Sequence, residues 1–162
     1  MKIEMWDIGR VKPYPGNPRR NDKAVEAVAR SIKEFGFRQP IVVDAGGVIV
    51  VGHTRYKAAL KLGLKTVPVH VAADLTPQQA RAYRLADNRT AENAEWDVDL
   101  LPIELGELRD DGLDLKLLGF TDKELAEHLK EFDTDLDGAD ADADEAAETI
   151  RCPKCGHEFA ME

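Results

Sequence analysis

The sequence "IVVDAGGVIVVGHTRYKAALKLGLKTVPVHV", residues 41–71, decides the fold of this chain. Its runs at 41–43 and 48–51 are rich in β-branched residues and flank "DAGG", which is typical of two strands joined by a glycine-containing hairpin turn. A helix is expected from His53 to Leu62, followed by a strand over 67–71. The combination of a hairpin with a strand–helix–strand unit predicts an α+β domain with a mixed sheet.

The flanking sequence continues this alternation of helices and strands. Apolar residues recur at three- and four-residue spacing over 22–35, which predicts an amphipathic helix that Asn21 or Asp22 caps and Gly36 ends. The remaining elements expected are a strand at 2–8, a proline-rich loop at 12–22, a helix that begins after Thr76, a helix at 99–110, and a helix that begins after Thr121 with a capping box to Glu124.

The charge of the chain is divided along its length. The 162 residues carry a net charge of -9, yet Lys and Arg outnumber Asp and Glu by 16 to 10 in residues 1–95. The balance reverses to 4 against 11 in residues 96–132, and residues 133–148 carry 8 acids and no base. The basic first part permits an anionic partner such as DNA, although scattered surface cations are an equal alternative.

Composition divides the chain into four parts. We expect an α+β domain at 1–95, a helical extension at 96–132, an acidic disordered linker at 133–148 and a short tail at 149–162. Apolar runs stay far below the ~20 residues that a bilayer span needs, and the first residues lack the pattern of a signal peptide. A cytoplasmic protein that does not enter a membrane is therefore expected.

The residues Gly52-His53-Thr54-Arg55 lie where a strand passes directly into a helix. The first backbone N–H groups of a helix have no intrahelical acceptor and lie at the positive end of its dipole, which suits a phosphate. Thr54 adds a hydroxyl, and Arg55 adds a planar guanidinium that can grip two phosphate oxygens. The structural alternative is an ordinary tight turn whose arginine pairs with a nearby acid.

Four segments occur in the order found in the ParB/sulfiredoxin superfamily. They are "PGNPRR" at 15–20, "SIKEFGFRQPIVV" at 31–43, "VVGHTRYKAALKLG" at 50–63 and "LADNRTAENAEW" at 85–96. From Ile8 to about Trp96 the chain therefore resembles the N-terminal domain of that superfamily, in particular the ParB-like proteins of phages and prophages that are associated with DNA methyltransferases. The resemblance implies a small mixed sheet with packed helices.

The resemblance also implies a nucleotide site that takes a nucleoside triphosphate, CTP or ATP, with Mg²⁺. Gly52, His53, Thr54 and Arg55 would lie on the phosphates, Gln39 and Pro40 on the base or sugar side, and Asp87 and Asn88, with Arg89 in the same motif, near the phosphates and Mg²⁺. From the residues alone, Asp87 and Asn88 are equally explained as a helix-terminal turn.

Three departures from the family pattern limit what the resemblance implies. Sulfiredoxins carry a nucleophilic cysteine where His53 stands, so their activity is not expected here. Partition proteins carry glutamate followed by two arginines at this place, and only the second arginine, Arg55, is kept. After Trp96 we find no clear helix-turn-helix reader and no dimerisation domain, so a complete centromere-binding partition protein is not expected.

The tail carries a C-x-x-C pair, Cys152 and Cys155, followed by His157. This spacing resembles one knuckle of a zinc ribbon, with His157 as a third ligand for Zn²⁺. A fourth ligand would come from a partner, from water or from a second copy in a homodimer. An unstructured tail and a redox dithiol are the alternatives.

Three functions remain open from the sequence. The first is a nucleotide-binding, DNA-associated accessory protein linked to partition or to the DNA modification of phages and mobile elements. The second is an enzyme, a nuclease or an NTP hydrolase, in which His53 is a catalytic general base near Asp87. The third is a protein-binding adaptor for a DNA methyltransferase that acts through the helices after Trp96.

Overall fold

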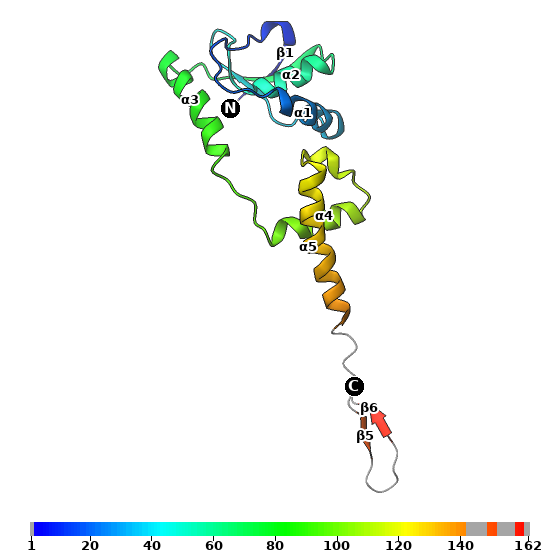
Figure 1. The fold of residues 1–162 in the computed structure, drawn as a ribbon. Helices are drawn as coiled ribbons and strands as arrows, with labels where there is room; N and C mark the ends of the chain where they lie inside the picture. Colours follow the sequence, from blue (N-terminus) through cyan, green and yellow to red (C-terminus); the bar gives the residue numbers. More distant parts are fainter. Residues whose placement is uncertain (1, 142–148, 152–157, 161–162) are drawn as a thin grey trace.

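The computed structural model describes residues 2–141, 149–151 and 158–160. Two units follow one another along the chain (Figure 1): an N-terminal unit of sheet and helices, residues 2–91, and a helical unit, residues 96–141. Within the described residues, no helix is long and apolar enough to cross a membrane.

The N-terminal unit is built on a four-stranded mixed sheet in the order β1-β4-β2-β3. These strands are β1 (Ile3–Asp7), β4 (Thr66–Val71), β2 (Ile41–Val43) and β3 (Ile49–Val51). β4 pairs antiparallel with β1 and parallel with β2, and β2 pairs antiparallel with β3. The expected α+β fold with a mixed sheet is therefore confirmed.

The core of this unit is formed mainly by the segment 41–71. Alternate residues of β4 are buried, and the buried side chains come from β1, the loop after β1, the hairpin, α2 (His53–Lys61) and β4. They are Trp6, Val11, Ile41, Val43, Ile49, Ala59, Val67 and Val69. Burying each large side chain of this kind stabilises the fold by about 1.5–3 kcal/mol.

Two helices, α1 (Asp22–Phe35) and α2, lie side by side against the sheet (Figure 1). Lys57 Nζ and Asp22 Oδ1 are 2.6 Å apart, and Lys61 pairs with Glu26, so two ion pairs join the helices. Gly36 ends α1 with φ +79° and donates its N–H to the carbonyl of Ile32, as expected. The two ion pairs join the first turns of α1 to the middle and the C-terminal end of α2.

Helix α3 (Pro77–Ala91) extends away from the sheet (Figure 1). It begins with the expected Thr76 cap, and Gln79 completes a capping box by accepting from the Thr76 N–H at 2.9 Å. Arg84, in the middle of α3, reaches back to the hairpin and donates from Nε to the Ile49 carbonyl at 2.9 Å. The middle of α3 is thereby fixed against β3.

The helical unit has a separate apolar core. It consists of α4 (Leu100–Asp110), a 3-10 turn η2 (Leu115–Leu118) and α5 (Asp122–Ala141), and its buried residues are Leu101, Leu105, Leu115 and Leu125. The expected capping box of Thr121 and Glu124 is present. Leu100 is 61% exposed, because Leu101 and Leu105 take the buried face of α4, and Trp96, before the helix, is 68% exposed.

Helix α5 continues through Ala141, into the segment for which the sequence predicts a linker. The ring of Phe132 lies against Gly106 of α4, and Arg109 Nη1 donates to Asp133 Oδ1 at 3.1 Å. These two contacts hold the helix on α4 beyond the last leucine of the core. The strands β5 (Thr149–Arg151) and β6 (Glu158–Ala160) pair antiparallel.

The two units touch through η2 and α1. Arg30 Nη2 donates to the carbonyl of Lys116 at 3.3 Å, and Gly119 lies next to the methyl group of Ala27. A shallow space lined by both elements, including Val28 and Leu117, surrounds this contact. The interface between the units is therefore small.

Candidate functional site

A cleft of about 410 Å³ opens at the N-terminal end of α2. A volume of this size is in the range of small-molecule sites. The loop before α1, the first turns of α1 and α2, and the C-terminal part of α3 line it. The polar lining residues are Asn17, Arg19, Arg20, Asn21, Lys23, Gly52, His53, Thr54, Arg55, Asp87 and Asn88.

Gly52 forms the turn at the centre of this cleft. Its φ of +106° lies in the region that favours glycine, and a Cβ there would come within 3.3 Å of the guanidinium of Arg55. The Gly52 carbonyl accepts from the N–H of Tyr56 and closes the first turn of α2. The preceding N–H groups, those of residues 53–55, have no acceptor within the helix and suit an anion.

The N-terminal end of α1 meets the same cleft. Asn21 occupies the N-cap position, but its side chain turns to α2 and donates from Nδ2 to Thr54 Oγ1 at 2.9 Å. Asn21 thus takes the expected N-cap position but makes no side-chain cap, because its Nδ2 is turned to α2 and its Oδ1 is buried with no hydrogen-bond partner among the described residues. Two helix dipoles consequently direct their positive ends to one place.

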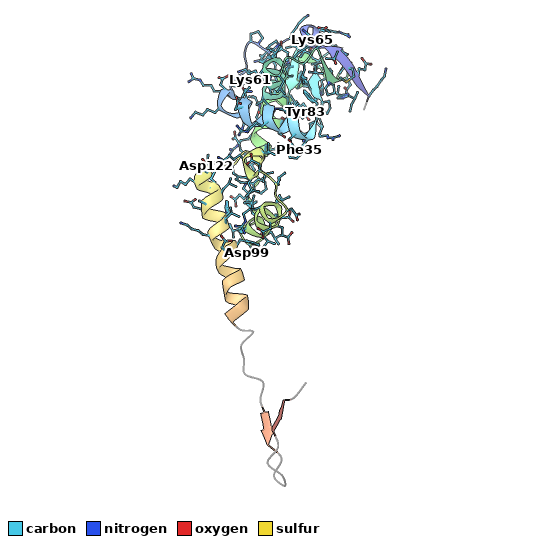
Figure 2. All side chains as sticks on the ribbon, turned by 90° about the vertical axis from the view of Figure 1, so that its right-hand side faces the viewer. Phe35, Lys61, Lys65, Tyr83, Asp99 and Asp122 are labelled. Carbon is cyan, nitrogen blue, oxygen red and sulfur yellow. The ribbon has the colours of Figure 1, made fainter. Side chains whose placement is uncertain are left out.

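Charged side chains make the cleft basic. Arg19, Arg20, Lys23 and Arg55 line it, whereas Asp87 is its one carboxylate among the described residues. In Figure 2 the labelled Lys61 and Lys65 lie on the N-terminal unit, and the labelled Asp99 and Asp122 lie on the helical unit. An anionic ligand is favoured at the cleft.

Arg55 separates this cleft from a second one of about 430 Å³. Its Nη1 donates to Gln39 Oε1, while its Nε is buried and has no acceptor among the described residues. Burial lowers the pKa of Arg55, and the carboxylate of Asp87 acts in the opposite direction. The guanidinium thus retains donor capacity between the two clefts.

The second cleft is more apolar than the first. Ile32, Phe35 and Phe37 line it together with Gln39, and it shares Val28 and Arg55 with the basic cleft. A polar cleft and an apolar cleft with one arginine between them suit a ligand that has an anionic end and a flat apolar end.

His53 faces the loop before α1 rather than a carboxylate. Its Nε2 accepts the backbone N–H of Tyr14 at 3.2 Å. Burial, followed by the positive charges of Arg84 and Lys57, lowers the pKa of His53 from 6.5 to about 4. The imidazole is therefore neutral at pH 7.

The three residues expected from the Asp87-Asn88-Arg89 motif differ in their surroundings. Asp87 and Asn88 line the basic cleft, whereas Arg89 lines neither cleft and pairs with Glu92 at 3.1 Å. Asn88 Oδ1 accepts from Arg19 Nη1, and Asn88 Nδ2 donates to the Arg84 carbonyl at 2.7 Å. Both ends of the Asn88 amide are thus used within the protein, which leaves Asp87 as the oxygen donor that fits a metal.

The other expected site residues are divided between the clefts and the tail. Gly52, His53, Thr54 and Arg55 lie together in the basic cleft, Gln39 lies in the apolar cleft, and Pro40 lines neither. The expected zinc ligands Cys152, Cys155 and His157 lie outside the described residues. Within the described ranges, no three His, Cys, Asp or Glu side chains gather in a metal-binding group.

Sequence reasoning missed the residues that link the cleft to the rest of the fold. Arg84 is 6% exposed, and its guanidinium carbon lies 4.1 Å from the ring centroid of Tyr14. Asn21 was assigned only to a helix cap. The one signal for Arg84 was an arginine at the centre of an otherwise weakly apolar helix, which by itself does not indicate burial.

Two family models match the chain. The ParB N-terminal domain matches residues 1–89, and the ParB-methyltransferase HTH domain matches residues 99–155. The second match corrects the expectation that no helix-turn-helix lies after Trp96. The sequence predicts the helices α4 and α5 that carry it only as a helical extension, because spacing alone does not distinguish a helix-turn-helix from another helical pair.

Similar proteins include both short and long relatives. The ParB-like nuclease domain-containing protein YnaK of Escherichia coli is 36% identical over 80 residues, which are 49% of this chain and 92% of that protein. Stage 0 sporulation protein J of Bacillus subtilis is 32% identical over 132 residues, which are 78% of this chain and 44% of that protein. This chain thus spans less than half of that longer relative.

Among solved structures, the C-terminally truncated chromosome-partitioning protein ParB of Caulobacter crescentus, complexed with CTP-gamma-S, is similar with a TM-score of 0.57. The two chains are 26% identical, and the match covers 79% of this chain and 70% of the other. The similarity extends beyond the N-terminal unit, because that unit alone is a smaller part of this chain.

Proposed function

This chain belongs to the family of the ParB N-terminal domain, whose model spans more than half of it. From that premise we propose that it is a nucleotide-binding, DNA-associated accessory protein. The nucleotide is a nucleoside triphosphate, CTP or ATP. One observation carries the proposal: the N-terminal ends of α1 and α2 and the guanidinium of Arg55 converge on one basic cleft.

The phosphates would occupy the basic cleft. The free N–H groups of residues 53–55 bind phosphate oxygens without a side chain, and Arg55 and Lys23 balance their charge. Thr54 adds a hydroxyl donor. In the Caulobacter relative the bound molecule is CTP-gamma-S, which supports a triphosphate as the ligand class.

The base would enter the apolar cleft on the other side of Arg55. The rings of Phe35 and Phe37 offer apolar surface there, and Gln39 offers an amide whose oxygen is already taken by Arg55. The NH₂ group of Gln39 is thereby left to donate to an acceptor on the base. A pyrimidine with a carbonyl acceptor, as in CTP, satisfies this arrangement.

Mg²⁺ would be held mainly by the triphosphate. This metal keeps several waters and needs one or two protein carboxylates besides the phosphates. Asp87 fits that role, whereas the amide of Asn88 is engaged by Arg19 and Arg84. When bound, the metal would neutralise part of the phosphate charge.

The phosphate backbone of DNA would be contacted mainly by the N-terminal unit, and the helix-turn-helix match at 99–155 is the candidate for contacts to the bases. Phosphate binding needs free Lys and Arg side chains. In the helical unit, Arg109 pairs with Asp110 and Asp133, and Lys116 and Lys123 pair with carboxylates as well. In the N-terminal unit Arg20 has no carboxylate partner among the described residues.

Calorimetric titration of the full chain with CTP and ATP, with and without Mg²⁺, tests the nucleotide site. Arg55→Ala should weaken binding at least about tenfold, because one charge-assisted contact to phosphate contributes about 1.5–3 kcal/mol. Arg81→Ala is the matched control, since Arg81 is exposed on α3 and lies outside both clefts. Wild-type protein that binds neither nucleotide would refute the proposal.

An adaptor for a DNA methyltransferase is the second candidate. Its support is the match of residues 99–155 to the ParB-methyltransferase HTH domain, together with the acidic surface of α4 and α5. It predicts a salt-sensitive complex with a methyltransferase even when the Arg55→Ala variant has lost nucleotide binding. Co-purification of the two defined proteins, with and without added salt, measures this.

A nuclease or NTP hydrolase is the third candidate and rests on the name of the similar ParB-like nuclease domain-containing protein. It predicts plasmid nicking or phosphate release by the purified chain. Asp87→Asn should abolish either reaction if Asp87 positions the metal.

A further inference from the structure

We infer that His53 and Thr54 are positioning residues that fasten the two ends of the loop 14–21 to the N-terminal end of α2. These two consecutive residues make one hydrogen bond each to opposite ends of the same loop, at Tyr14 and at Asn21. The loop then holds Arg19 and Arg20 at the mouth of the basic cleft.

The first bond fixes the tautomer of His53. The backbone N–H of Tyr14 can only donate, so His53 Nε2 must accept, and the imidazole proton lies on Nδ1. This arrangement needs the neutral ring, in agreement with the low pKa of His53. The lone pair that a general base would use is therefore already engaged by the protein.

The second bond orients the hydroxyl of Thr54. Because Asn21 Nδ2 donates to Thr54 Oγ1 at 2.9 Å, the hydroxyl hydrogen of Thr54 is left to donate elsewhere. Thr54 lines the basic cleft. Asn21 stands at the N-cap position of α1 but makes no side-chain cap there, so its Nδ2 group is directed to α2.

The loop between the two bonds is also tied to α3. Arg19 Nη1 donates to the backbone and side-chain oxygens of Asn88 at 3.2 and 3.1 Å and pairs with Glu92 at 3.3 Å. The ring of Tyr14 lies under the guanidinium of Arg84. The loop thus joins the N-terminal end of α2, through residues 53 and 54, to α3.

Trypsin cleavage after Arg19 and Arg20 of the full chain, without nucleotide, measures how firmly the loop is held. His53→Asn places an amide near the Nδ1 position and loses the bond to Tyr14, whereas His53→Gln places an oxygen near the Nε2 position and keeps it. Thr54→Val removes the hydroxyl, and Thr54→Ser keeps it. Thermal melts confirm that each variant is folded.

His53→Asn and Thr54→Val should each raise the cleavage rate about five- to tenfold, the effect of one lost hydrogen bond, and His53→Gln and Thr54→Ser should restore it. Unchanged cleavage in both disruptive variants would overturn the inference. A triphosphate hydrolysis activity that both His53→Gln and His53→Asn abolish, with cleavage unchanged, would identify a base instead.

A second readout, nucleotide affinity, rests on the proposed function. The disruptive variants should weaken CTP binding about five- to tenfold, and the conservative variants should restore it. If the wild-type chain binds no nucleotide, the proposed function fails, yet the cleavage rates still decide whether residues 53 and 54 hold the loop. The two failures are therefore distinguishable.

Discussion

Arg84 of α3 donates from Nε to the backbone carbonyl of Ile49 in β3 over 2.9 Å. Its Nη2 lies 3.5 Å from Asp44 Oδ2, and Asp44 Oδ1 in turn accepts from the N–H groups of Gly46 and Val48 in the hairpin turn. One buried guanidinium thus joins the hairpin, the loop at Tyr14 and α3. At this edge of the sheet the guanidinium satisfies the Ile49 carbonyl, while the N–H of Ile49 donates to the Lys12 carbonyl.

Replacement of Arg84 by Met should destabilise the N-terminal unit by about 2–4 kcal/mol, because a buried carbonyl and the Asp44 carboxylate lose their charged donor. Arg81→Met, one turn away on the exposed side of α3, should change the free energy of unfolding by less than about 0.5 kcal/mol. Urea unfolding of both variants measures the difference. Equal effects would show that the contact to Ile49 contributes little.

Gly52→Ala tests the turn at the cleft. The φ of +106° is strained for alanine, and the new methyl group would press on Arg55, so a loss of about 1–3 kcal/mol is expected together with weaker nucleotide binding. Gly63→Ala carries similar backbone strain at φ +69°, but nothing lies within 4 Å of the added methyl group. It should lower stability by about 1 kcal/mol and leave nucleotide affinity unchanged.

The low pKa of His53 predicts a pH dependence of stability. The folded-state pKa of about 4 lies below the ordinary value of 6.5, so the unfolded chain binds more protons between these two pH values. The free energy of unfolding should therefore fall as the pH drops from 6.5 to about 4, with no contribution from His53 above 6.5.

His53→Gln removes this contribution and is the control for the carboxylates that titrate in the same range. Urea midpoints of both proteins at about pH 7 and about pH 4 measure it. The wild type should lose more stability than the variant. Parallel pH profiles of the two proteins would show that His53 is no more buried when folded than when unfolded.

Gly106→Ala should disrupt the contact between α4 and α5. The added methyl group would occupy the space of the Phe132 ring, and overpacking of this kind destabilises by about 1–3 kcal/mol. Phe132→Ala opens the space again, so adding Gly106→Ala to that variant should have almost no further effect. A double-mutant cycle with helicity as readout measures this coupling. Additive effects would contradict the close contact.

Much of the N-terminal unit could be predicted, because its elements are encoded by local spacing. The hairpin around "DAGG", the helix after Gly52 and the cap at Thr76 each depend on residues close in sequence. Gly52 could be placed at an anion site for the same reason: a strand that enters a helix through glycine exposes N–H groups wherever it occurs.

The remaining features depend on partners far apart in sequence. Asn21 is a residue type that commonly caps helices, but its side-chain amide donates a hydrogen bond to Thr54, 33 residues away. Asn88 is a residue type that can bind a metal or a phosphate, but its side-chain oxygen accepts from Arg19 and its NH₂ group donates to the Arg84 carbonyl. Local pattern does not reveal such pairings, since the competing partner arrives only when the helices pack.

In the acidic segment, contacts between distant residues accompany a helix that composition does not predict. Residues 133–141 have a composition typical of disorder, yet α5 includes them. The contacts that extend the helix, Phe132 on Gly106 and Arg109 with Asp133, join positions 24 or more residues apart. Composition therefore predicted the charge of this segment and not its conformation.

The separate cores of the two units have a practical consequence for folding experiments. Trp6 is buried in the first core, and Trp96 lies at a ring-centroid distance of 5.6 Å from Phe120 beside the second. Because they are the chain's 2 tryptophans, each unit carries its own fluorophore. Because the interface through Arg30 is small, the two units can unfold at different temperatures. A single transition temperature for the whole chain would then describe the unfolding of neither unit. A Trp96→Phe variant should report the first unit alone, and a Trp6→Phe variant the second.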